Sequence, residues 1–278
     1  MKRLVLLLGA AALAGGACGP GRTAAATQPT PAAFDPAQSD PAALEIVDAS
    51  VAALGGAEHW QAIKQLQFDV KYTMDGQLKS WYRHAWDRWN GRHNFQSADL
   101  ATDDGKPGSM KWMEVFYDLF DDDAKPHATY GGKEVAREDA IRFRGDARTR
   151  LSEDGYYLTL LYKQRDPGVM LHVEGEVKDV EGTCNPGCTT VKITFDPAVG
   201  KDTWYVNYNT STKLPEVIEK EGPQGRLGFK ITDWAEAGGL RWPAKIQNIG
   251  LPGEVFEFSD IKVGDPDDRL YVPQVVGG

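Results

Sequence analysis

The stretch LQFDVKYTM, residues 66–74, decides the fold class of this chain. Large apolar residues alternate in it with polar residues. A period of two is typical of a β-strand with one face in a core and the other in water. The following Asp75-Gly76 is a tight-turn signal and predicts that the chain returns as an antiparallel neighbour. These residues therefore predict a fold that is built on an antiparallel sheet.

The same alternation recurs through most of the later sequence. It predicts further strands within residues 82–87, 113–119, 171–177, 191–195, 204–208, 229–231, 244–246 and 256–258. About ten antiparallel strands would then share one apolar face, and a twisted sheet of that size tends to curl. Its concave face needs a cover, because an apolar face must be buried against another element.

Helical segments are available as that cover. Asp40-Pro41 is a helix-start signal, residues 41–54 carry apolar side chains at helical spacing, and Gly55-Gly56 ends the helix. Further helical pieces are expected over residues 57–65, 139–150 and 156–162. The predicted fold class is α+β and mostly β: a large curved antiparallel sheet, an open and incomplete β-barrel, that a few helices cover on its concave side.

Residues 1–18 have the layout of a bacterial export signal. Lys2 and Arg3 precede an apolar stretch over residues 4–13, and small residues then lead to Cys18. Signals of this layout resemble those of lipoproteins, in which the cysteine becomes the lipidated first residue. Cleavage after Ala14, at an A-x-A site, is the alternative.

The rest of the chain divides into a tether and a domain. Residues 19–40 are rich in Ala, Pro, Thr and Gln, and their one large apolar residue is Phe34. Such a segment cannot bury enough apolar surface to fold by itself, so we expect a flexible tether. Residues 41–278 are expected to form a single domain.

The composition excludes several classes of protein. The 278 residues carry a formal net charge of −9, which argues against a nucleic-acid partner, since such partners usually need a basic face. Hydrophobic residues make up 41% and aromatic residues 10%, enough to fill a sizeable core, so the chain is not disordered as a whole. The long apolar run at the N-terminus is too short to span a bilayer comfortably.

The three cysteines fall into a pair and a single residue. Cys184 and Cys188 flank Asn-Pro-Gly, a turn that would bring two strands together. A disulfide there would close a short loop and contribute roughly 2 kcal/mol in the chain-entropy account. Two free thiols and a metal site are the alternatives, although no second Cys or His pair lies nearby. The pairing leaves Cys18 free to carry an acyl chain.

Signatures of the common catalytic families are missing, since the sequence has no G-x-S-x-G, H-E-x-x-H or Walker loop. We therefore assign no catalytic residue, cofactor or metal ligand. His84 shares its strand parity with Tyr82 and Trp86, so it is either a proton donor in a pocket or a satisfied core residue. A carboxylate pair or a His–carboxylate pair that points into the concavity with perturbed pKa values would indicate an enzyme, and we expect none. The run 121–123 of three Asp residues is interpreted as a solvated turn rather than a Ca²⁺ loop.

Several short motifs resemble those of the outer-membrane lipoprotein-sorting proteins, the LolA-like and LolB-like family. They are ALGG at 53–56, YKQRDPGV at 162–169, DTWYV at 202–206 with TSTKLP at 210–215, and GLRWP at 239–243. The resemblance covers residues 42–273 and points to an uncharacterised bacterial lipoprotein branch of that fold. It implies a hydrophobic cavity between a curved sheet and helices, which the sorting proteins use for the acyl chains of a lipoprotein in transit.

These observations predict a non-enzymatic lipoprotein of the bacterial cell envelope that binds a lipid or a lipoprotein acyl chain in an apolar cavity, in lipoprotein sorting or lipid trafficking. A lipid on Cys18 would anchor it in the outer membrane, facing the periplasm. The cavity lining is expected to consist of Leu66, Phe68, Val70, Tyr72, Tyr82, Trp86, Val115 and Tyr117. The alternatives are an interaction or structural protein with a filled core, and an envelope hydrolase.

Overall fold

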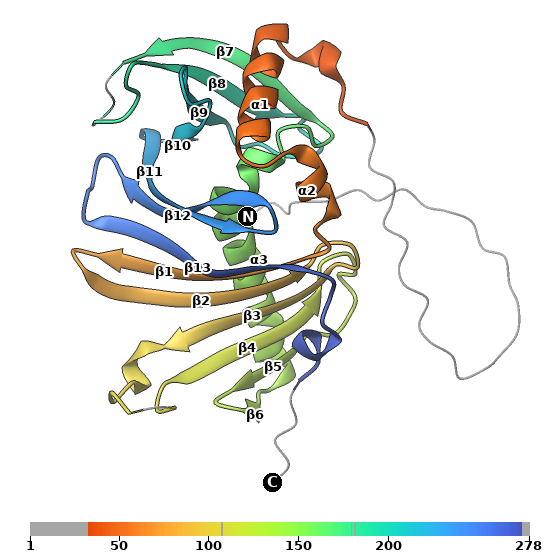
Figure 1. The fold of residues 1–278 in the computed structure, drawn as a ribbon. Helices are drawn as coiled ribbons and strands as arrows, with labels where there is room; N and C mark the ends of the chain where they lie inside the picture. Colours follow the sequence, from red (N-terminus) through yellow and green to blue (C-terminus); the bar gives the residue numbers. More distant parts are fainter. Residues whose placement is uncertain (1–32, 107, 179, 181, 274–278) are drawn as a thin grey trace, which may run out of the picture.

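The computed structural model describes residues 33–106, 108–178, 180 and 182–273 (Figure 1). The predicted export signal, Cys18 and the predicted tether up to residue 32 lie outside these residues. Within the described ranges the chain forms one strongly curved sheet with helices packed on it.

The described residues form a 13-stranded sheet with the order β6-β5-β4-β3-β2-β1-β13-β12-β11-β10-β9-β8-β7, in which the paired neighbours are antiparallel. The first and last strands of the chain are neighbours, so β1–β13 joins the two halves of the sheet. The strands are β1 (Gln65–Met74), β2 (Gln77–Asp87), β3 (Arg92–Asp99), β4 (Lys111–Asp118), β5 (His127–Tyr130), β6 (Lys133–Glu134), β7 (Val169–Val177), β8 (Cys188–Phe195), β9 (Trp204–Asn209), β10 (Pro215–Gly222), β11 (Gly225–Ala237), β12 (Leu240–Asn248) and β13 (Glu254–Gly264).

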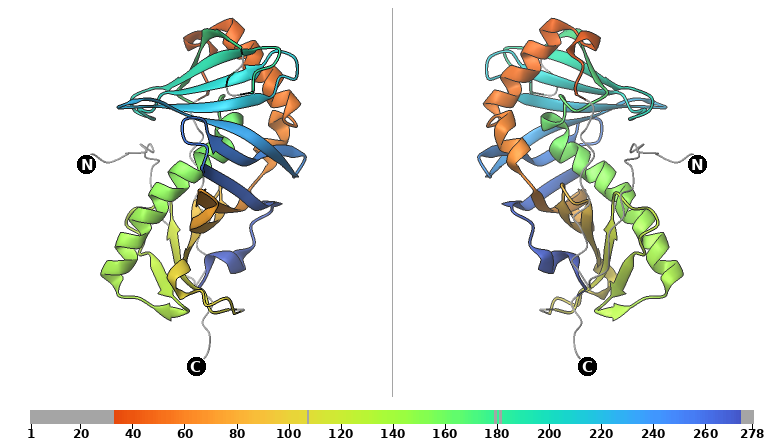
Figure 2. Two further views of the ribbon diagram at one scale, coloured as in Figure 1. Left: turned by 90° about the vertical axis from the view of Figure 1, so that its left-hand side faces the viewer. Right: turned by 90° about the vertical axis from the view of Figure 1, so that its right-hand side faces the viewer.

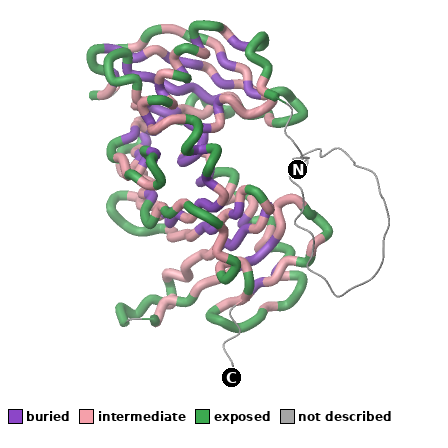
Figure 3. Tube along the Cα trace, turned by 45° about the vertical axis from the view of Figure 1, so that its right-hand side comes forward, coloured by how far each residue is buried: buried purple, intermediate pink, exposed green. Residues whose placement is uncertain are grey.

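The register continues one apolar face from strand to strand. Val70 of β1 lies opposite Tyr82 of β2 and Phe258 of β13, and in the other half Val206 of β9 lies opposite Val191 of β8. These side chains belong to one hydrophobic cluster on the concave face. The two views in Figure 2 show how the sheet twists and curls around that face. Burial is denser along β7–β12 than along β4–β6 (Figure 3).

The helices all lie on the concave side. They are α1 (Pro41–Ala53), α2 (Ala57–Ala62) and the long α3 (Arg137–Thr159), with the short 3-10 turns η1 (Pro36–Gln38), η2 (Leu100–Thr102), η3 (Leu160–Tyr162) and η4 (Asp268–Tyr271) elsewhere in the chain. Val47 of α1, Trp60 of α2 and Leu158 of α3 are buried in the same cluster as the inward side chains of the strands. The predicted fold class, a curved and open antiparallel sheet with helices on its concave face, is confirmed.

The chain just before α1 covers one free edge of the sheet. The backbone N–H of Asp40 donates to the carbonyl of Leu171 at 2.8 Å, and the Ser39 hydroxyl accepts from the Leu171 N–H at 3.0 Å. The Asp40 carboxylate accepts from the Val173 N–H at 2.9 Å instead of capping the helix. Because open strand edges are templates for unwanted pairing, this contact protects β7. The opposite edge, β6, is two charged residues long.

The structure differs from the sequence expectations in two respects. The two helical pieces expected over 139–150 and 156–162 are one helix, α3, that continues into η3. Strands β3, β5, β6 and β10 were not predicted, so the described sheet has thirteen strands rather than about ten. In β3 the inward positions include His93 and Ser97, which weaken the apolar alternation, and in β10 a register shift between Pro215 and Val217 interrupts it.

Candidate ligand-binding groove

A groove of about 410 Å³ lies between α3 and the sheet. Its lining consists of Tyr82, Phe95, Ser97, Met113 and Val115 from β2, β3 and β4, and of Phe143, Asp146, Thr149 and Arg150 from α3. We call it the α3 groove. A smaller groove of about 320 Å³ lies between the end of α1 and the β11–β12 hairpin, where small side chains and backbone predominate.

The sheet register builds the floor of the α3 groove. Inward side chains of β1 to β4 form three rows of cross-strand neighbours. The rows are Val70–Tyr82–Ser97–Met113, Phe68–His84–Phe95–Val115 and Leu66–Trp86–His93–Tyr117. The groove takes its floor from the first two rows, so the floor is a stripe of aromatic and aliphatic surface that carries the hydroxyls of Tyr82 and Ser97.

Helix α3 forms the opposite wall and stands on small side chains. Ala140 and Ala147 are buried against Phe95, Val115 and Tyr117 in a second, small hydrophobic cluster. Alanines let the helix backbone approach the sheet, but they bury little area compared with large side chains. The N-terminal part of α3 is therefore held to the sheet by few apolar contacts, which leaves room beside them for the groove.

Arginines fix the same part of α3 from the side. The Arg144 guanidinium donates to the carbonyls of Asp122 and Ala124, at 2.9 and 3.1 Å. Arg148 donates to the carbonyls of Asp118 and Leu119 and pairs with the Asp122 carboxylate. The acidic run 121–123 is thus a turn that receives two arginines of α3, and not a free carboxylate cluster.

The rim of the α3 groove is polar. Arg150 pairs with Glu153 at 3.0 Å, and its guanidinium lies 5.5 Å from the centre of the Tyr82 ring. Asp146 and Thr149 are exposed on the same stretch of helix. An apolar floor with a charged rim fits a ligand that has an apolar body and a polar end.

A buried chain of hydrogen bonds runs below the groove, which we call the histidine chain: Tyr117, His93, His84 and Asp154. The distances are 2.8 Å between Tyr117 Oη and His93 Nδ1, 3.2 Å between His93 Nε2 and His84 Nδ1, and 3.3 Å between His84 Nε2 and Asp154 Oδ2. Burial, and to a smaller degree the neighbouring His84, lower the pKa of His93 well below its usual value. Burial raises the pKa of the Tyr117 hydroxyl.

The concave face nevertheless holds a buried His–carboxylate pair. His84 and Asp154 form such a pair, with 2% of each residue exposed. A general acid or base must reach the reacting atom of a substrate within hydrogen-bond distance. His84 is packed between the rings of Phe68 and Phe95, at 4.7 and 5.1 Å between ring centres, and lines neither of the two grooves described above. The pair is a feature of the packed interior.

The predicted lining residues lie on one face but at different depths. Tyr82 and Val115 line the α3 groove. Leu66, Phe68 and Val70 are fully buried beside it, and Tyr117 lies in the histidine chain. Trp86 and Tyr72 are half-buried at the margin of the main cluster, with the Tyr72 ring 4.9 Å from that of Phe256. Their role in binding stays a prediction.

The sequence analysis missed most of the groove. Phe95 and Ser97 belong to a strand that it did not predict, and Met113 lies opposite Ser97. Phe143, Asp146, Thr149 and Arg150 reach the site only because α3 crosses strands that are distant in sequence. The alternation of His93, Phe95 and Ser97 with Asn94 and Gln96 was the available signal for the strand.

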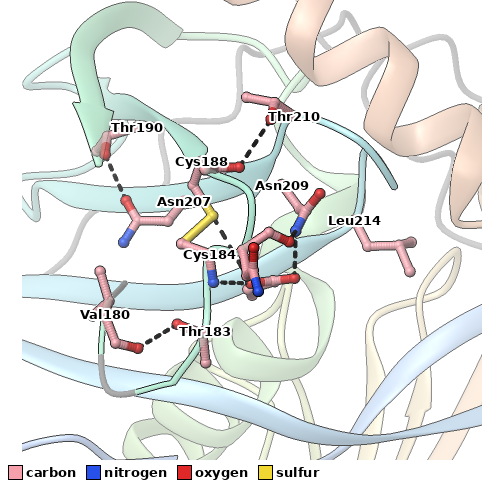
Figure 4. The surroundings of a disulfide bond; sticks show 12 residues. Val180, Thr183, Cys184, Cys188, Thr190, Asn207, Asn209, Thr210 and Leu214 are labelled. Carbon is pink, nitrogen blue, oxygen red and sulfur yellow. Dashed lines mark hydrogen bonds between the residues drawn. A yellow bond between two sulfur atoms is a disulfide. The ribbon is translucent and has the colours of Figure 1, made fainter. Parts of the chain in front are cut away.

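Cys184 and Cys188 form a disulfide in the structure (Figure 4). Its turn is held by Asn209, whose amide donates to the Asn185 carbonyl at 3.1 Å, and by Thr210, whose hydroxyl donates to the Gly187 carbonyl at 3.0 Å. Glu216 lies close enough to be a third metal ligand. A metal would need the cysteine thiolates, and here both sulfurs are in the disulfide.

With the geometry established, the chain can be compared with known proteins. Neither a protein-family model nor a curated protein matches its sequence. Its architecture is similar to that of the LolA superfamily. A LolA superfamily protein from Nitrosomonas europaea aligns with a TM-score of 0.43 and 12% identity, over 83% of this chain and 97% of that one.

Two further solved structures are similar to the same degree. A DUF1329 family protein from Desulfovibrio piger gives a TM-score of 0.44 at 10% identity, over 84% of this chain and 98% of that chain. A domain named for outer-membrane lipoprotein sorting, from Vibrio parahaemolyticus, gives 0.41 at 10% identity, over 82% and 96%. These structural matches, at 10–12% identity, concern the fold alone. None of the helices in the described part of this chain is long and apolar enough to cross a membrane.

Proposed function

We propose that this protein binds the acyl chain of a lipid or lipoprotein in the α3 groove, as a non-enzymatic component of the bacterial cell envelope. The observation that supports it is the groove itself, which has a volume of about 410 Å³. One wall is the helix α3, and the floor is the part of the sheet that carries Tyr82, Phe95, Met113 and Val115. That volume lies within the usual range of small-molecule sites, roughly 300–1,000 Å³. The chemistry of the floor favours an apolar ligand.

Burial of an acyl chain is the favourable contribution to such binding. Ten methylene groups buried in the groove would contribute about 8 kcal/mol at ~0.8 kcal/mol each. The entropic costs of binding offset part of this contribution, so the net affinity is weaker than the burial alone would give. The rim residues Thr149 and Arg150 would then meet the polar end of the ligand, where a charged or hydroxylated head group remains in water.

Closure of the groove depends on α3. The N-terminal part of the helix rests on alanines on the sheet side and is tied at its flank by Arg144 and Arg148, whereas Leu158 near its C-terminal end is buried in the main cluster. The main cluster, with Leu66, Phe68 and Val70, would stay packed. We propose that ligand enters when the N-terminal part of α3 lifts from the sheet.

The test is native mass spectrometry of residues 38–278, which lack Cys18, after export to a bacterial periplasm and purification without detergent, followed by organic extraction of what is bound. The proposal expects a stoichiometric added mass that is identified as an acyl lipid. In the variant Ser97→Trp an indole fills the groove, and we expect the added mass to fall at least tenfold in occupancy.

Gln96→Trp is the matched control. Gln96 directly precedes Ser97 in β3, is half-buried like it, and points to the opposite face. Its side chain bonds to Glu114 at 2.8 Å and does not reach the groove. Equal lipid occupancy in both variants would contradict binding in this groove. A folded wild-type protein without any lipid would favour the alternative of a surface-interaction protein.

A further inference from the structure

The histidine chain joins α3 to the sheet. His84 comes from β2, His93 from β3 and Tyr117 from β4, while Asp154 comes from α3. Asp154 lies one turn beyond Arg150, the last residue of α3 that lines the groove. A contact at Asp154 therefore ties α3 to the sheet next to the groove-forming part of the helix.

With neutral imidazoles, the hydrogen bonds of the chain run in one direction. The Tyr117 hydroxyl donates to His93 Nδ1, His93 Nε2–H donates to His84 Nδ1, and His84 Nε2–H donates to the Asp154 carboxylate. Every bond is made, but a single neutral N–H faces a buried carboxylate. A buried carboxylate is costly unless a cation pairs with it.

A proton added to His84 changes that balance. His84 then donates from both nitrogens, to Asp154 and to His93 Nε2, and His93 turns its own proton toward the Tyr117 oxygen. The proton comes from solvent, no bond of the chain is lost, and the Asp154 contact becomes an ion pair with a charge-assisted hydrogen bond. Burial keeps the pKa of His93 well below its usual value, so His93 remains the neutral acceptor that this arrangement needs.

We propose that His84 and Asp154 form a proton-operated latch, which holds α3 against the sheet when His84 is protonated and loosens it when His84 is neutral. Its effect on ligand rests on the proposed function: a latched helix retains the ligand in the α3 groove, and a loosened helix exchanges it. The latch itself is a property of the chain without ligand.

The surroundings of the pair contain few competing charges. His84 meets Phe68 of β1 and Phe95 of β3 with its ring faces, and His93 and Asp154 with its nitrogens. At the far end, the Arg148 guanidinium lies 5.8 Å from the Tyr117 ring centre. Two imidazoles and a carboxylate could also suggest a metal, but a metal needs three donor atoms that converge. Here the His84 ring lies between the other two donors.

The experiment measures hydrogen exchange of the α3 amides in the mature chain at about pH 5.5 and 8.5, a range over which imidazoles change charge. Protection factors are corrected for the intrinsic effect of pH. We expect protection over residues 143–159 to be roughly tenfold higher at the lower pH, since ~1.4 kcal/mol separates a charge-assisted from a neutral hydrogen bond. In Asp154→Asn, which keeps an acceptor but not the charge, protection should not rise at low pH.

His172→Gln is the matched control, because His172 pairs with Asp40 at 3.5 Å in a half-buried position on β7, away from α3, and its loss should leave the pH response intact. Equal wild-type protection at both pH values would overturn the latch, and so would a pH response that survives in Asp154→Asn. Dissociation of N-phenyl-1-naphthylamine, an apolar fluorophore without charge in this range, should be roughly tenfold faster at the higher pH (~1.4 kcal/mol). If that probe binds at neither pH, the proposed function fails while hydrogen exchange still decides the latch.

Discussion

At the scale of single residues, His93 shows what burial does to an ionisable group. The residue is fully buried between His84 and Tyr117, both of which it contacts through its nitrogens. Burial and the nearby His84 hold its pKa well below the usual value, so the folded protein binds no proton there under conditions in which an unfolded chain would. Folding therefore makes protonation of His93 less favourable than it is in the unfolded chain.

This shift predicts the sign of a pH effect on stability. Above about pH 6.5 neither state protonates His93, and its contribution is fully present. As the pH falls below that value, the unfolded chain takes up a proton that the folded chain refuses, and stability falls by about 1.4 kcal/mol per pH unit. We expect the free energy of unfolding of His93→Gln, measured with urea, to fall less steeply with decreasing pH than that of wild type. The difference in slope should correspond to one proton fewer taken up on unfolding. Parallel curves for the two proteins from pH 7 to 5 would contradict it.

At the scale of elements, the sequence predicts what is local. The alternation in residues 66–74 identifies β1, and Gly55-Gly56 marks the end of α1, because both signals lie within one element. Strand β3 was missed since two of its inward residues, His93 and Ser97, are polar. The α3 groove was out of reach because it depends on α3 crossing β2–β4, a contact between segments separated by tens of residues. His84 was placed on the correct face, but its partner Asp154 comes from that same crossing.

The junction of α1 and α2 fits against the β11–β12 hairpin through Gly55. Its φ is +116°, and an added Cβ would lie 2.1 Å from the carbonyl oxygen of Gly239. We expect Gly55→Ala to lower the free energy of unfolding by more than about 2 kcal/mol, from backbone strain together with the lost contact. Gly76→Ala is the control, since Gly76 has φ +75° with nothing within 4 Å, and strain alone should cost ~1 kcal/mol. Equal losses in chemical denaturation would contradict the role of the close approach.

At the scale of the whole molecule, the two halves of the sheet have different properties. On the β7–β12 side, Leu171, Ile193 and Trp242 are fully buried or nearly so, and the core is filled. On the β2–β4 side the second cluster is small, and α3 leaves the groove open. Stability and binding are thus separated along one sheet, so changes at the groove need not unfold the protein.

The predicted attachment of the whole molecule to a membrane rests on Cys18 rather than on charge. The predicted signal carries Lys2 and Arg3, so its removal would make the mature chain more negative than −9, and an anionic bilayer surface would repel it. We therefore expect a lipid on Cys18 to supply the attachment. We expect wild-type protein to sediment with membranes and to stay there in about 1 M NaCl, where the Debye length is roughly 3 Å. Cys18→Ser should move to the soluble fraction. The double variant Cys184→Ser/Cys188→Ser, which removes the two cysteines of the disulfide and keeps Cys18, should remain attached. Release of wild type by salt would show instead that the contact is electrostatic. A soluble mature form that begins at Gly15 would show that the signal is cut after Ala14.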